Sequence, residues 1–208
     1  MYKTDQEDFW AGEFGREYIE RNDSIEQLAS NISFFAEVFR PCNKVQSIIE
    51  FGANIGMNIK AIKQLLPFAK ISAIEINKKA CEELDKIDMG GGGEIFNDSV
   101  LNVNLVCKYD FAFIKGVLIH LNPDELHNVY NRLYECVKLN GYIMIAEYYN
   151  PTPVMVEYRG YKDKLFKRDF AGELMDKYPS LELLDYGFTY RRKSLNDDMN
   201  WFLMKKNK

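Results

Sequence analysis

The stretch from residue 45 onward alternates short apolar runs with amphipathic segments, and this alternation constrains the fold more than any other feature of the sequence. Such a pattern is typical of a mostly parallel β-sheet that helices cover on both faces. We therefore predict a doubly wound α/β domain built on seven strands. The last two strands have only a loop between them, so the open sheet is expected to end in an antiparallel hairpin.

The element boundaries follow from the apolar runs and from the Pro, Gly, Asn and Asp residues between them. The expected strands span residues 47–51, 70–76, 94–96, 111–114, 142–147, 181–188 and 201–204. The expected helices between them span residues 57–66, 78–87, 124–137 and 169–178. Ahead of this core, residues 6–22 suggest one or two short helices broken at Gly12 and Gly15. Residues 24–39 predict an amphipathic helix with Ser24 as its N-cap.

The 208 residues fit one domain, and 47% hydrophobic with 28% charged residues is ordinary for a globular protein. We divide the chain into N-terminal helices that could act as a lid (1–44), a cofactor-binding core (45–147) and an acceptor loop with the terminal hairpin (148–208). A net charge of −4 argues against a general nucleic-acid binder, and nowhere do about 18 apolar residues follow one another. We expect a cytoplasmic monomer or homodimer without membrane or nucleic-acid partners.

The four cysteines, Cys42, Cys81, Cys107 and Cys136, are widely scattered along the chain. They form no C-x-x-C pair and have no nearby histidine that would complete a zinc site. We interpret them as reduced core thiols and expect no metal.

Residues 47–56 read as a buried strand that runs into a tight turn and then a helix. Gly52 and Gly56 let the backbone turn sharply and approach a ligand, while the start of the helix offers free N–H groups. A dinucleotide site requires a third glycine where this chain has Asn54. Glu50, just before the turn, is awkward beside a pyrophosphate but suits the ammonium group of a methionine moiety. The turn therefore favours a nucleotide-like ligand with an amine over NAD.

Two further acidic residues follow the next two strands. Glu75, beside Ile76, lies nineteen residues after Gly56, and its two oxygens could bind both hydroxyls of a ribose. Asp98, beside Ser99, could accept from the amino group of an adenine. Because the carboxyl ends of parallel strands meet at one edge of the sheet, the three acids predict positions for an amine, a ribose and a base in one crevice.

At these positions the sequence resembles the class I S-adenosylmethionine-dependent methyltransferases. The resemblance rests on Glu50-Phe51-Gly52-Ala53-Asn54-Ile55-Gly56, Glu75, Asp98 and residues 110–120, and it covers roughly residues 45–147. It implies a Rossmann-like methyltransferase fold with S-adenosylmethionine as cofactor. It further implies that the first motif contacts the methionine part, that the acid after the second strand holds the ribose, and that the segment after the fourth strand, with Lys115, packs under the cofactor. Asn54 departs from the family, which more often has glycine there.

A narrower resemblance rests on FWAGEFGREYIERN (9–22) at one end and on YRG (158–160), LFKRDF (165–170) and DYGF (185–188) at the other. These segments look like the methylases associated with biosynthesis of pseudaminic acid, an acidic nine-carbon sugar of bacterial surface glycans. The match implies an anionic sugar or nucleotide sugar as acceptor.

The same resemblance supports a lid at the N-terminus. In that interpretation Trp10 and Tyr18 screen the sulfonium from water, and Tyr18 or Arg21 reaches the methionine carboxylate. The alternative is that these aromatic residues simply bury one side of a short helix.

Methyl transfer from a sulfonium is an in-line displacement, so positioning can supply about 7–11 kcal/mol of the barrier and few catalytic residues are needed. A hydroxyl acceptor must also lose a proton, which favours a base with a pKa near the working pH. His120 is the candidate base, with a structural histidine as the alternative. Tyr148 and Tyr149 follow the fifth strand, where a tyrosine could orient the acceptor or serve as the base, or could only pack in a loop.

Residues 151–169 form an insertion without clear periodicity, which we interpret as a lid or substrate wall. Its candidate acceptor-binding residues are Tyr158, Arg159, Lys167 and Arg168, and Arg159 could grip a sugar-acid carboxylate bidentately. A solvated charged face is the alternative for the other lysines.

The function favoured by the sequence is methyl transfer from S-adenosylmethionine to an acidic sugar or its nucleotide-activated form, with O-methylation preferred to N-methylation. The alternatives are a non-catalytic cofactor-binding partner of a glycan pathway, an N-methyltransferase of another small metabolite, and a nicotinamide-dependent oxidoreductase on the same kind of sheet. Binding of labelled cofactor and candidate acceptors separates these possibilities.

Overall fold

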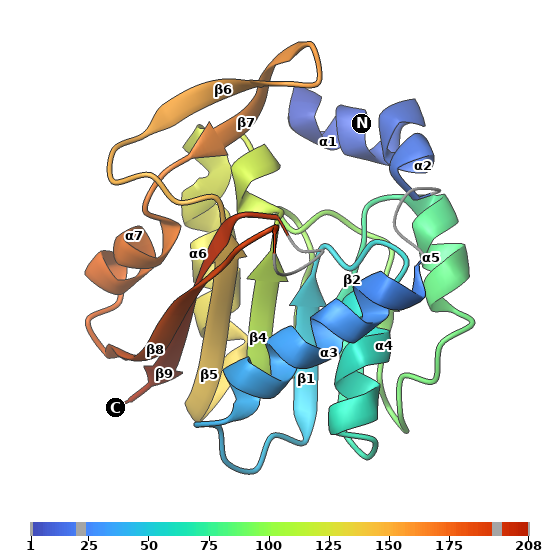
Figure 1. Cartoon of the computed structure of the whole chain (residues 1–208), viewed down its shortest axis with the longest axis vertical. Helices are drawn as coiled ribbons and strands as arrows, with labels where there is room; N and C mark the ends of the chain where they lie inside the picture. The colour runs from blue at the N-terminus through green and yellow to red at the C-terminus, as the bar shows by residue number, and fades with distance from the viewer. Residues whose placement is uncertain (1, 20–23, 193–196, 208) are drawn as a thin grey trace.

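The computed structural model describes residues 2–19, 24–192 and 197–207, and it contains a seven-stranded sheet in the order β3-β2-β1-β4-β5-β9-β8 (Figure 1). Strands β1 to β5 are parallel to one another, while β9 is antiparallel to both β5 and β8. The strands are β1 (Ser47–Phe51), β2 (Lys70–Ile74), β3 (Ile95–Phe96), β4 (Tyr109–Lys115), β5 (Val137–Glu147), β8 (Leu181–Thr189) and β9 (Met199–Lys206). The predicted fold class, a doubly wound and mostly parallel sheet with an antiparallel end, is confirmed.

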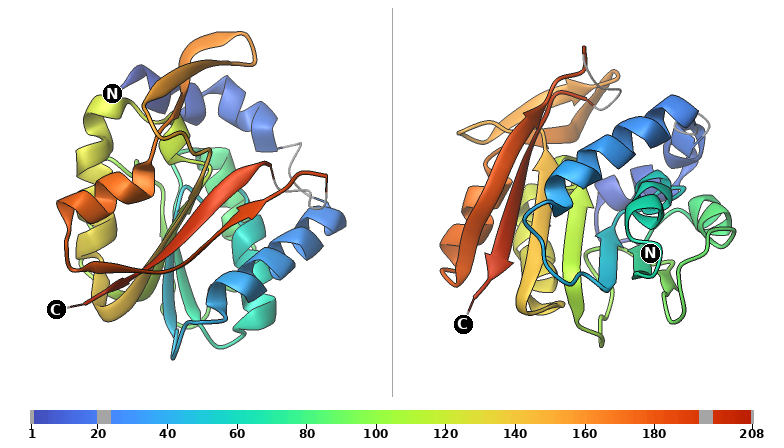
Figure 2. Two further views of the ribbon diagram at one scale, coloured as in Figure 1. Left: turned by 60° about the vertical axis from the view of Figure 1, so that its left-hand side comes forward. Right: turned by 60° about the horizontal axis from the view of Figure 1, so that its bottom comes forward.

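Helices cover both faces of this sheet (Figure 2). The helical elements are α1 (Asp5–Ala11), α2 (Glu13–Ile19), α3 (Ile25–Phe39), α4 (Met57–Leu65), α5 (Lys78–Leu84), α6 (Leu126–Glu135) and α7 (Phe170–Lys177), with the 3-10 turns η1 (Leu118–His120) and η2 (Pro123–Glu125). Helices α3 and α4 pack on one face, and α6 and α7 pack on the other. Ser24 caps α3 as predicted, because its Oγ accepts from Gln27 N at 3.1 Å.

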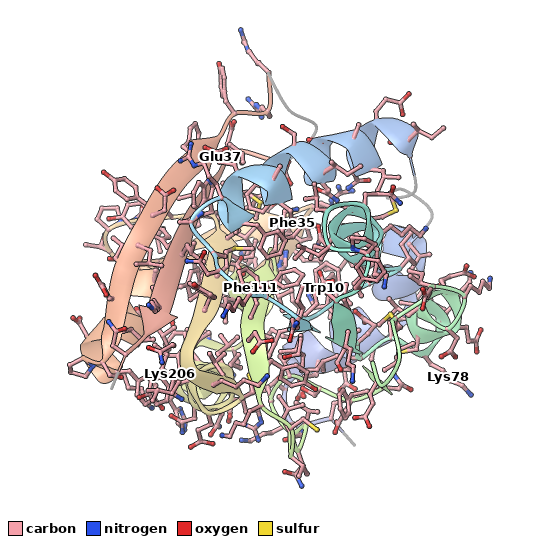
Figure 3. All side chains as sticks on the ribbon, turned by 90° about the horizontal axis from the view of Figure 1, so that it is seen from below. Trp10, Phe35, Glu37, Lys78, Phe111 and Lys206 are labelled. Carbon is pink, nitrogen blue, oxygen red and sulfur yellow. The ribbon has the colours of Figure 1, made fainter. Side chains whose placement is uncertain are left out.

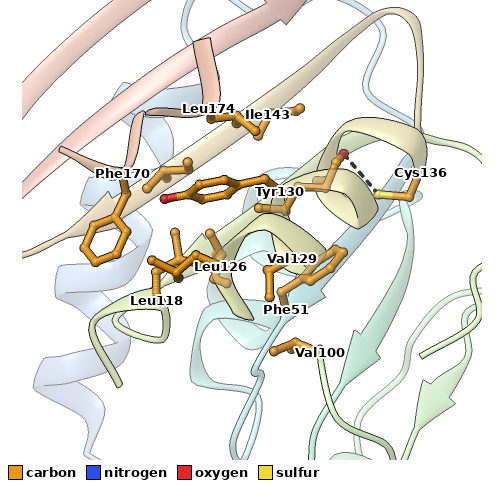
Figure 4. Packing of buried hydrophobic residues seen from close by; sticks show 14 of the residues in the cluster. Phe51, Val100, Leu118, Leu126, Val129, Tyr130, Cys136, Ile143, Phe170 and Leu174 are labelled. Atoms are coloured by element: carbon orange, nitrogen blue, oxygen red, sulfur yellow. Dashed lines mark hydrogen bonds between the residues drawn. The ribbon is translucent and has the colours of Figure 1, made fainter. Parts of the chain in front are cut away.

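The period of two in β1 divides its side chains between two cores. Ile48 faces α3 and α4, where the rings of Phe35 and Phe113 pack at 5.3 Å; Figure 3 shows Phe35 and Phe111 in this layer. Phe51 faces α6 on the other side, in the cluster of buried residues that Figure 4 shows around Tyr130. Glu50 shares its face with Ile48, so its carboxyl group points toward the layer of α3 and α4.

Residues 151–169 differ from the aperiodic loop that the sequence predicts. They contain a β-hairpin made of β6 (Val154–Tyr158) and β7 (Tyr161–Lys167), separate from the main sheet. Arg159 and Gly160 connect the strands with φ of 50° and 84°, and two successive positive φ angles are what a type I′ turn requires. The prediction of an aperiodic loop was therefore wrong. A two-residue turn that ends in glycine joins two strands, and these strands make up most of the segment.

Helices α1 and α2 lie across the carboxyl edge of the parallel strands, beside the β6–β7 hairpin (Figure 1). Gly12 separates the two helices as predicted, whereas Gly15 lies inside α2. Two side-chain bonds anchor α1: Gln6 Nε2 donates to the Asp163 carbonyl at 3.0 Å, and Asn77 Nδ2 donates to the Trp10 carbonyl at 3.1 Å. This helix thus connects the hairpin to the start of α5.

All four cysteines are free thiols, but only Cys81 and Cys136 are buried. Cys107 is exposed in the loop before β4, so the prediction of core thiols is wrong for this residue. Within the described ranges, no helix is both long and apolar enough to cross a membrane. The same ranges hold no group of three or more His, Cys, Asp or Glu side chains that could bind a metal ion.

Candidate functional site

A cavity lies at the carboxyl ends of β1, β2 and β4, bordered by helices α1 and α2. Its walls come from α1 and α2, from α3, from the turn after β1, and from the segments that follow β2, β3 and β4. The structure brings most of the predicted cofactor-binding residues into these walls, together with the candidate base His120. Those cofactor residues are Trp10, Tyr18, Gly52, Ala53, Asn54, Glu75, Ile76, Ser99 and Lys115.

The turn after β1 needs unusual backbone geometry, and its residues supply it. Gly52 has a φ of 79°, and a Cβ atom there would lie 2.6 Å from Cγ2 of Val117, so only glycine fits. Asn54 has a φ of 47°, in the left-handed region that asparagine tolerates better than most residues. This explains how Asn54 can replace the commoner glycine. Gly56 precedes α4 without a side-chain cap, which leaves the first N–H groups of the helix for a ligand.

Glu75 connects the turn after β1 to the start of α5. Its Oε2 accepts from Asn54 N at 2.7 Å, and its Oε1 accepts from Asn77 N at 2.7 Å. Burial raises the pKa of this carboxyl group, while these N–H donors act to lower it. A carboxylate offers about four acceptor positions, so each oxygen keeps one for a further donor such as a ribose hydroxyl.

The end of the cavity between β1, α3 and α4 is rich in hydrogen-bond acceptors. Glu50 Oε1 accepts from Asn58 Nδ2 at 2.6 Å, and burial raises the pKa of Glu50 to about 8 although Asn58 and Lys115 oppose this rise. Glu50 Oε2, Asn31 Oδ1 and Asn58 Oδ1 are buried and have no hydrogen-bond partner among the described residues. Buried acceptors normally have partners, so this end suits a ligand group with several donors, such as an ammonium.

Lys115 is the cation at the same end of the cavity. It follows Ile114 at the end of β4, and its Nζ lies 5.8 Å from the centroid of the Phe34 ring. Burial lowers the pKa of Lys115, whereas the nearby carboxylates, Glu50 foremost, raise it. The acceptors around Glu50 and the ammonium of Lys115 together complement both charges of an amino-acid group.

Glu147, at the end of β5, supports the loop that carries His120. Its Oε1 accepts from Val117 N and from Leu118 N, both at 2.9 Å. Burial raises the pKa of Glu147 to about 7, and these backbone donors lower it. From the sequence, Glu147 was predicted only as the last residue of a strand. The sequence signal that could have marked it as a site residue is its acidic side chain at the end of an otherwise apolar strand.

His120 lines the cavity between two aromatic rings. The ring centroids of Trp10 and Tyr158 lie 4.7 and 4.8 Å from that of His120. His120 Nδ1 is 2.6 Å from the Lys164 carbonyl oxygen, which only accepts, so Nδ1 carries the proton and Nε2 is unprotonated. Burial lowers the pKa of His120 to about 4, against the bond to Lys164. The side chain is therefore neutral at pH 7 and presents a hydrogen-bond acceptor.

The two tyrosines after β5 lie outside the walls of the cavity. The Tyr148 hydroxyl donates to Asp197 Oδ2 at 2.7 Å, and burial raises its pKa, which opposes a role as base at neutral pH. Tyr149 is exposed, with its ring 6.2 Å from that of Phe202. Tyr158 reaches the site indirectly, through its ring contact with His120.

The predicted acceptor-binding cations also lie outside the walls. Arg159 sits in the hairpin turn, 5.7 Å from the centroid of the Tyr158 ring, and Lys167 Nζ lies 5.3 Å from that of Tyr148. Arg168 Nε forms an ion pair with Glu173 Oε1 at 2.6 Å. None of these three cations lines the cavity. The hairpin that carries Arg159 and Lys167, which the sequence did not reveal, places them against the rings of Tyr158 and Tyr148.

Four predicted cofactor residues are not among the described residues of the walls. Glu50 and Gly56 lie next to wall residues, as described above. Asp98 is exposed, and its Oδ1 accepts from Ser99 N at 2.7 Å, so among the described residues it borders the cavity only through its neighbour Ser99. Arg21 lies outside the described residues. Six polar wall residues were not predicted from the sequence: Gln6, Glu7, Gln27, Asn31, Asn58 and Asn77. Asn77, directly after Glu75 and Ile76 and before a helix, carried a readable N-cap signal; the others depend on how helices pack.

Comparison with family models and with curated proteins finds no match. Solved structures do match. A Leishmania major S-adenosylmethionine-dependent methyltransferase aligns with a TM-score of 0.72 and 18% identity over 98% of this chain and 87% of that chain. The chain has the Rossmann-like methyltransferase fold.

Two further structures with this fold contain S-adenosylhomocysteine. The Burkholderia thailandensis 1,6-didemethyltoxoflavin-N1-methyltransferase, which also holds 1,6-didemethyltoxoflavin, aligns with a TM-score of 0.70 and 14% identity over 98% of this chain and 87% of that chain. The N-methyltransferase NodS from Bradyrhizobium japonicum aligns with a TM-score of 0.68 and 9% identity over 92% and 98%. At such identities the likeness concerns the fold, and the narrower resemblance to pseudaminic acid-associated methylases stays a prediction.

Proposed function

We propose that this protein is an S-adenosylmethionine-dependent methyltransferase that acts on a small molecule. The observation that carries the proposal is the match between the cavity walls and the separate parts of that cofactor. Buried acceptors without partners in the described part of the chain suit an ammonium: they belong to the wall residues Asn31 and Asn58 and to Glu50, which accepts from Asn58. The wall residue Lys115 suits the carboxylate of the same group. Glu75 keeps free acceptor positions for two ribose hydroxyls.

The bound cofactor would supply a methyl group on a positively charged sulfur. The protein's task is then positioning and exclusion of water. Trp10 and Tyr18 of the lid, with ring centroids 5.4 Å apart, would cover the reacting centre. His120 Nε2 would accept a hydrogen bond from the hydroxyl or amine of the acceptor and so orient its lone pair. With a pKa of about 4, His120 positions the acceptor at neutral pH and removes a proton only weakly.

The acceptor class is a finer part of the proposal. The resemblance of both ends of the sequence supports an acidic sugar or nucleotide sugar. The wall geometry adds no support for its anionic group, because Arg159, Lys167 and Arg168 are not among the wall residues. An N-methyltransferase of another metabolite is the second candidate, favoured by a neutral histidine and by two acidic wall residues, Glu7 and Glu75.

Calorimetry with S-adenosylhomocysteine and with NAD tests the cofactor. We expect binding of the first and none of the second, and the reverse result would establish a nicotinamide enzyme instead. Methyl transfer from labelled S-adenosylmethionine to a panel of nucleotide sugars, sugar acids and amines tests the reaction. Tight cofactor binding with no transfer to any member of the panel would favour the non-catalytic partner.

A further inference from the structure

Glu7 of α1 is a buried carboxylate that faces the cavity, and the function proposed above does not use it. Its side chain is only 3% exposed. One oxygen serves the helix: Oε2 accepts from Lys3 N at 2.8 Å and from Thr4 N at 2.9 Å, within a capping box. The other oxygen, Oε1, is buried without a hydrogen-bond partner in the part of the chain that the structure describes. Because Glu7 lines the cavity, a ligand bound there can supply the missing donor.

The contacts of α1 locate Glu7 along the cavity. Next to Glu7, Lys3 Nζ forms an ion pair with Glu125 Oε2 at 2.6 Å, just beyond the wall residue Leu121. At the other end of the helix, the Trp10 carbonyl accepts from Asn77, just beyond the wall residue Ile76. Helix α1 therefore spans from the segment after β4 to the segment after β2. Glu7 lies over the part of the cavity between them.

That part of the cavity has the walls of a base-binding slot. Ile76, Val100 and Leu121 contribute apolar surface immediately past Glu75, whose carboxylate is the expected ribose partner. A flat heteroaromatic ring fits between such side chains, but its polar edge still requires partners. Asp98 was predicted for that edge, yet it is exposed and its Oδ1 is engaged by Ser99 N. Glu7 presents the buried acceptor that this edge lacks.

We propose that Glu7 Oε1 accepts a hydrogen bond from the exocyclic amino group of the cofactor's adenine, so that the lid itself recognises the base. The inference rests on the proposed function, because it requires an adenosyl cofactor in the cavity. A carboxylate oxygen only accepts, so Glu7 favours an amino group and opposes a carbonyl oxygen at the same ring position.

The substitution Glu7→Gln reverses the polarity of this one atom. Glutamine keeps an oxygen for Lys3 N and Thr4 N and is compatible with a capping box, so its NH₂ group then faces the cavity. The probes are S-adenosylhomocysteine and S-inosylhomocysteine, which has a carbonyl oxygen in place of the amino group. Calorimetry gives the ratio of their dissociation constants for each variant.

We expect the wild type to prefer the adenosyl compound, and Glu7→Gln to reduce that preference by about tenfold or more, equivalent to roughly 1.4 kcal/mol. Thr4→Ala is the matched control: it removes the Oγ that accepts from Glu7 N but leaves the carboxylate, so it should weaken both ligands equally. Asp98→Asn should leave the ratio unchanged.

Three results would count against the proposal. An unchanged ratio in Glu7→Gln, with melting that shows a folded protein, overturns it. A ratio that collapses in Asp98→Asn instead transfers the role to Asp98. If Thr4→Ala changes the ratio as much as Glu7→Gln, lid stability rather than polarity sets the preference. Failure of the wild type to bind S-adenosylhomocysteine at all overturns the proposed function, which separates the two failures.

Discussion

The two sides of the cavity are built in different ways. The side around Glu50 and Lys115 stands on β1 and β4 in the middle of the sheet, and its polar atoms are buried acceptors with a single cation. The lid side is made of aromatic rings from α1, η1 and β6, with Trp10, His120 and Tyr158 in contact. The first side is fixed by the sheet and suits a constant cofactor. The second is assembled from peripheral elements and suits a variable acceptor.

A change of pH affects the stability contributed by the two sides in opposite directions. The pKa of Glu50 is raised to about 8, so its contribution to stability is complete below its ordinary pKa of 4.5 and is lost as the pH rises through 8. The pKa of His120 is lowered to about 4 from 6.5, so its contribution is complete above pH 6.5 and is lost as the pH falls through 4. Acid therefore weakens the lid side and alkali weakens the sheet side of the ligand-free protein.

The largest effect is expected from Glu75→Ala on the sheet side. The variant removes the ribose partner and also leaves Asn54 N and Asn77 N without their acceptor. We expect S-adenosylhomocysteine to bind about 100-fold more weakly, roughly 2.7 kcal/mol, with a lower melting temperature. Calorimetry and thermal unfolding measure the two effects. Glu94→Ala, on an exposed residue before β3, is the control, and equal affinity in Glu75→Ala and the wild type would refute the ribose assignment.

Next in size is the pH dependence of cofactor binding. Glu50 must lose its proton to form an ion pair with an ammonium group, so affinity for S-adenosylhomocysteine should rise by up to about tenfold per pH unit between pH 6 and 8. Calorimetry in buffers of different ionisation enthalpy should detect proton release. Glu50→Gln should flatten the profile. Glu147→Gln, a buried acid held by Val117 and Leu118, should keep the slope, and the opposite pattern would move the ammonium site to Glu147.

A smaller effect separates backbone strain from side-chain chemistry in the turn after β1. Asn54 has a φ of 47°, so Asn54→Val should lower the free energy of unfolding by about 1–2 kcal/mol, because a β-branched residue is strained there. Asn54→Gly should be tolerated and should retain cofactor affinity, since the Asn54 N–H that Glu75 accepts is a backbone group. Chemical denaturation of both variants gives the comparison. Loss of binding in Asn54→Gly would show that the asparagine side chain itself is used.

The difference between the two sides also explains what the sequence could predict. Glu50, Gly52 and Glu75 were predictable because each lies at or directly after the end of a strand, and parallel strands end at one edge whatever their neighbours do. The walls supplied by Asn31 and Glu7 were not, because the approach of α3 and α1 depends on tertiary packing. The position of Arg159 outside the cavity wall was not predictable either, because it depends on the hairpin register and on the type I′ turn at Arg159 and Gly160, which was overlooked.

The smallest effect at neutral pH is expected from His120→Asn on the lid side. His120 is already neutral at pH 7, and asparagine can still donate to the Lys164 carbonyl, so the unfolding free energy should change by less than about 1 kcal/mol there. Between pH 6.5 and 4 the wild type should lose stability because its unfolded state binds the extra proton, while the variant should lose less. Thermal unfolding across this range measures the difference. Parallel curves for the two proteins would mean that His120 titrates normally, and that the lid does not shield the site from water.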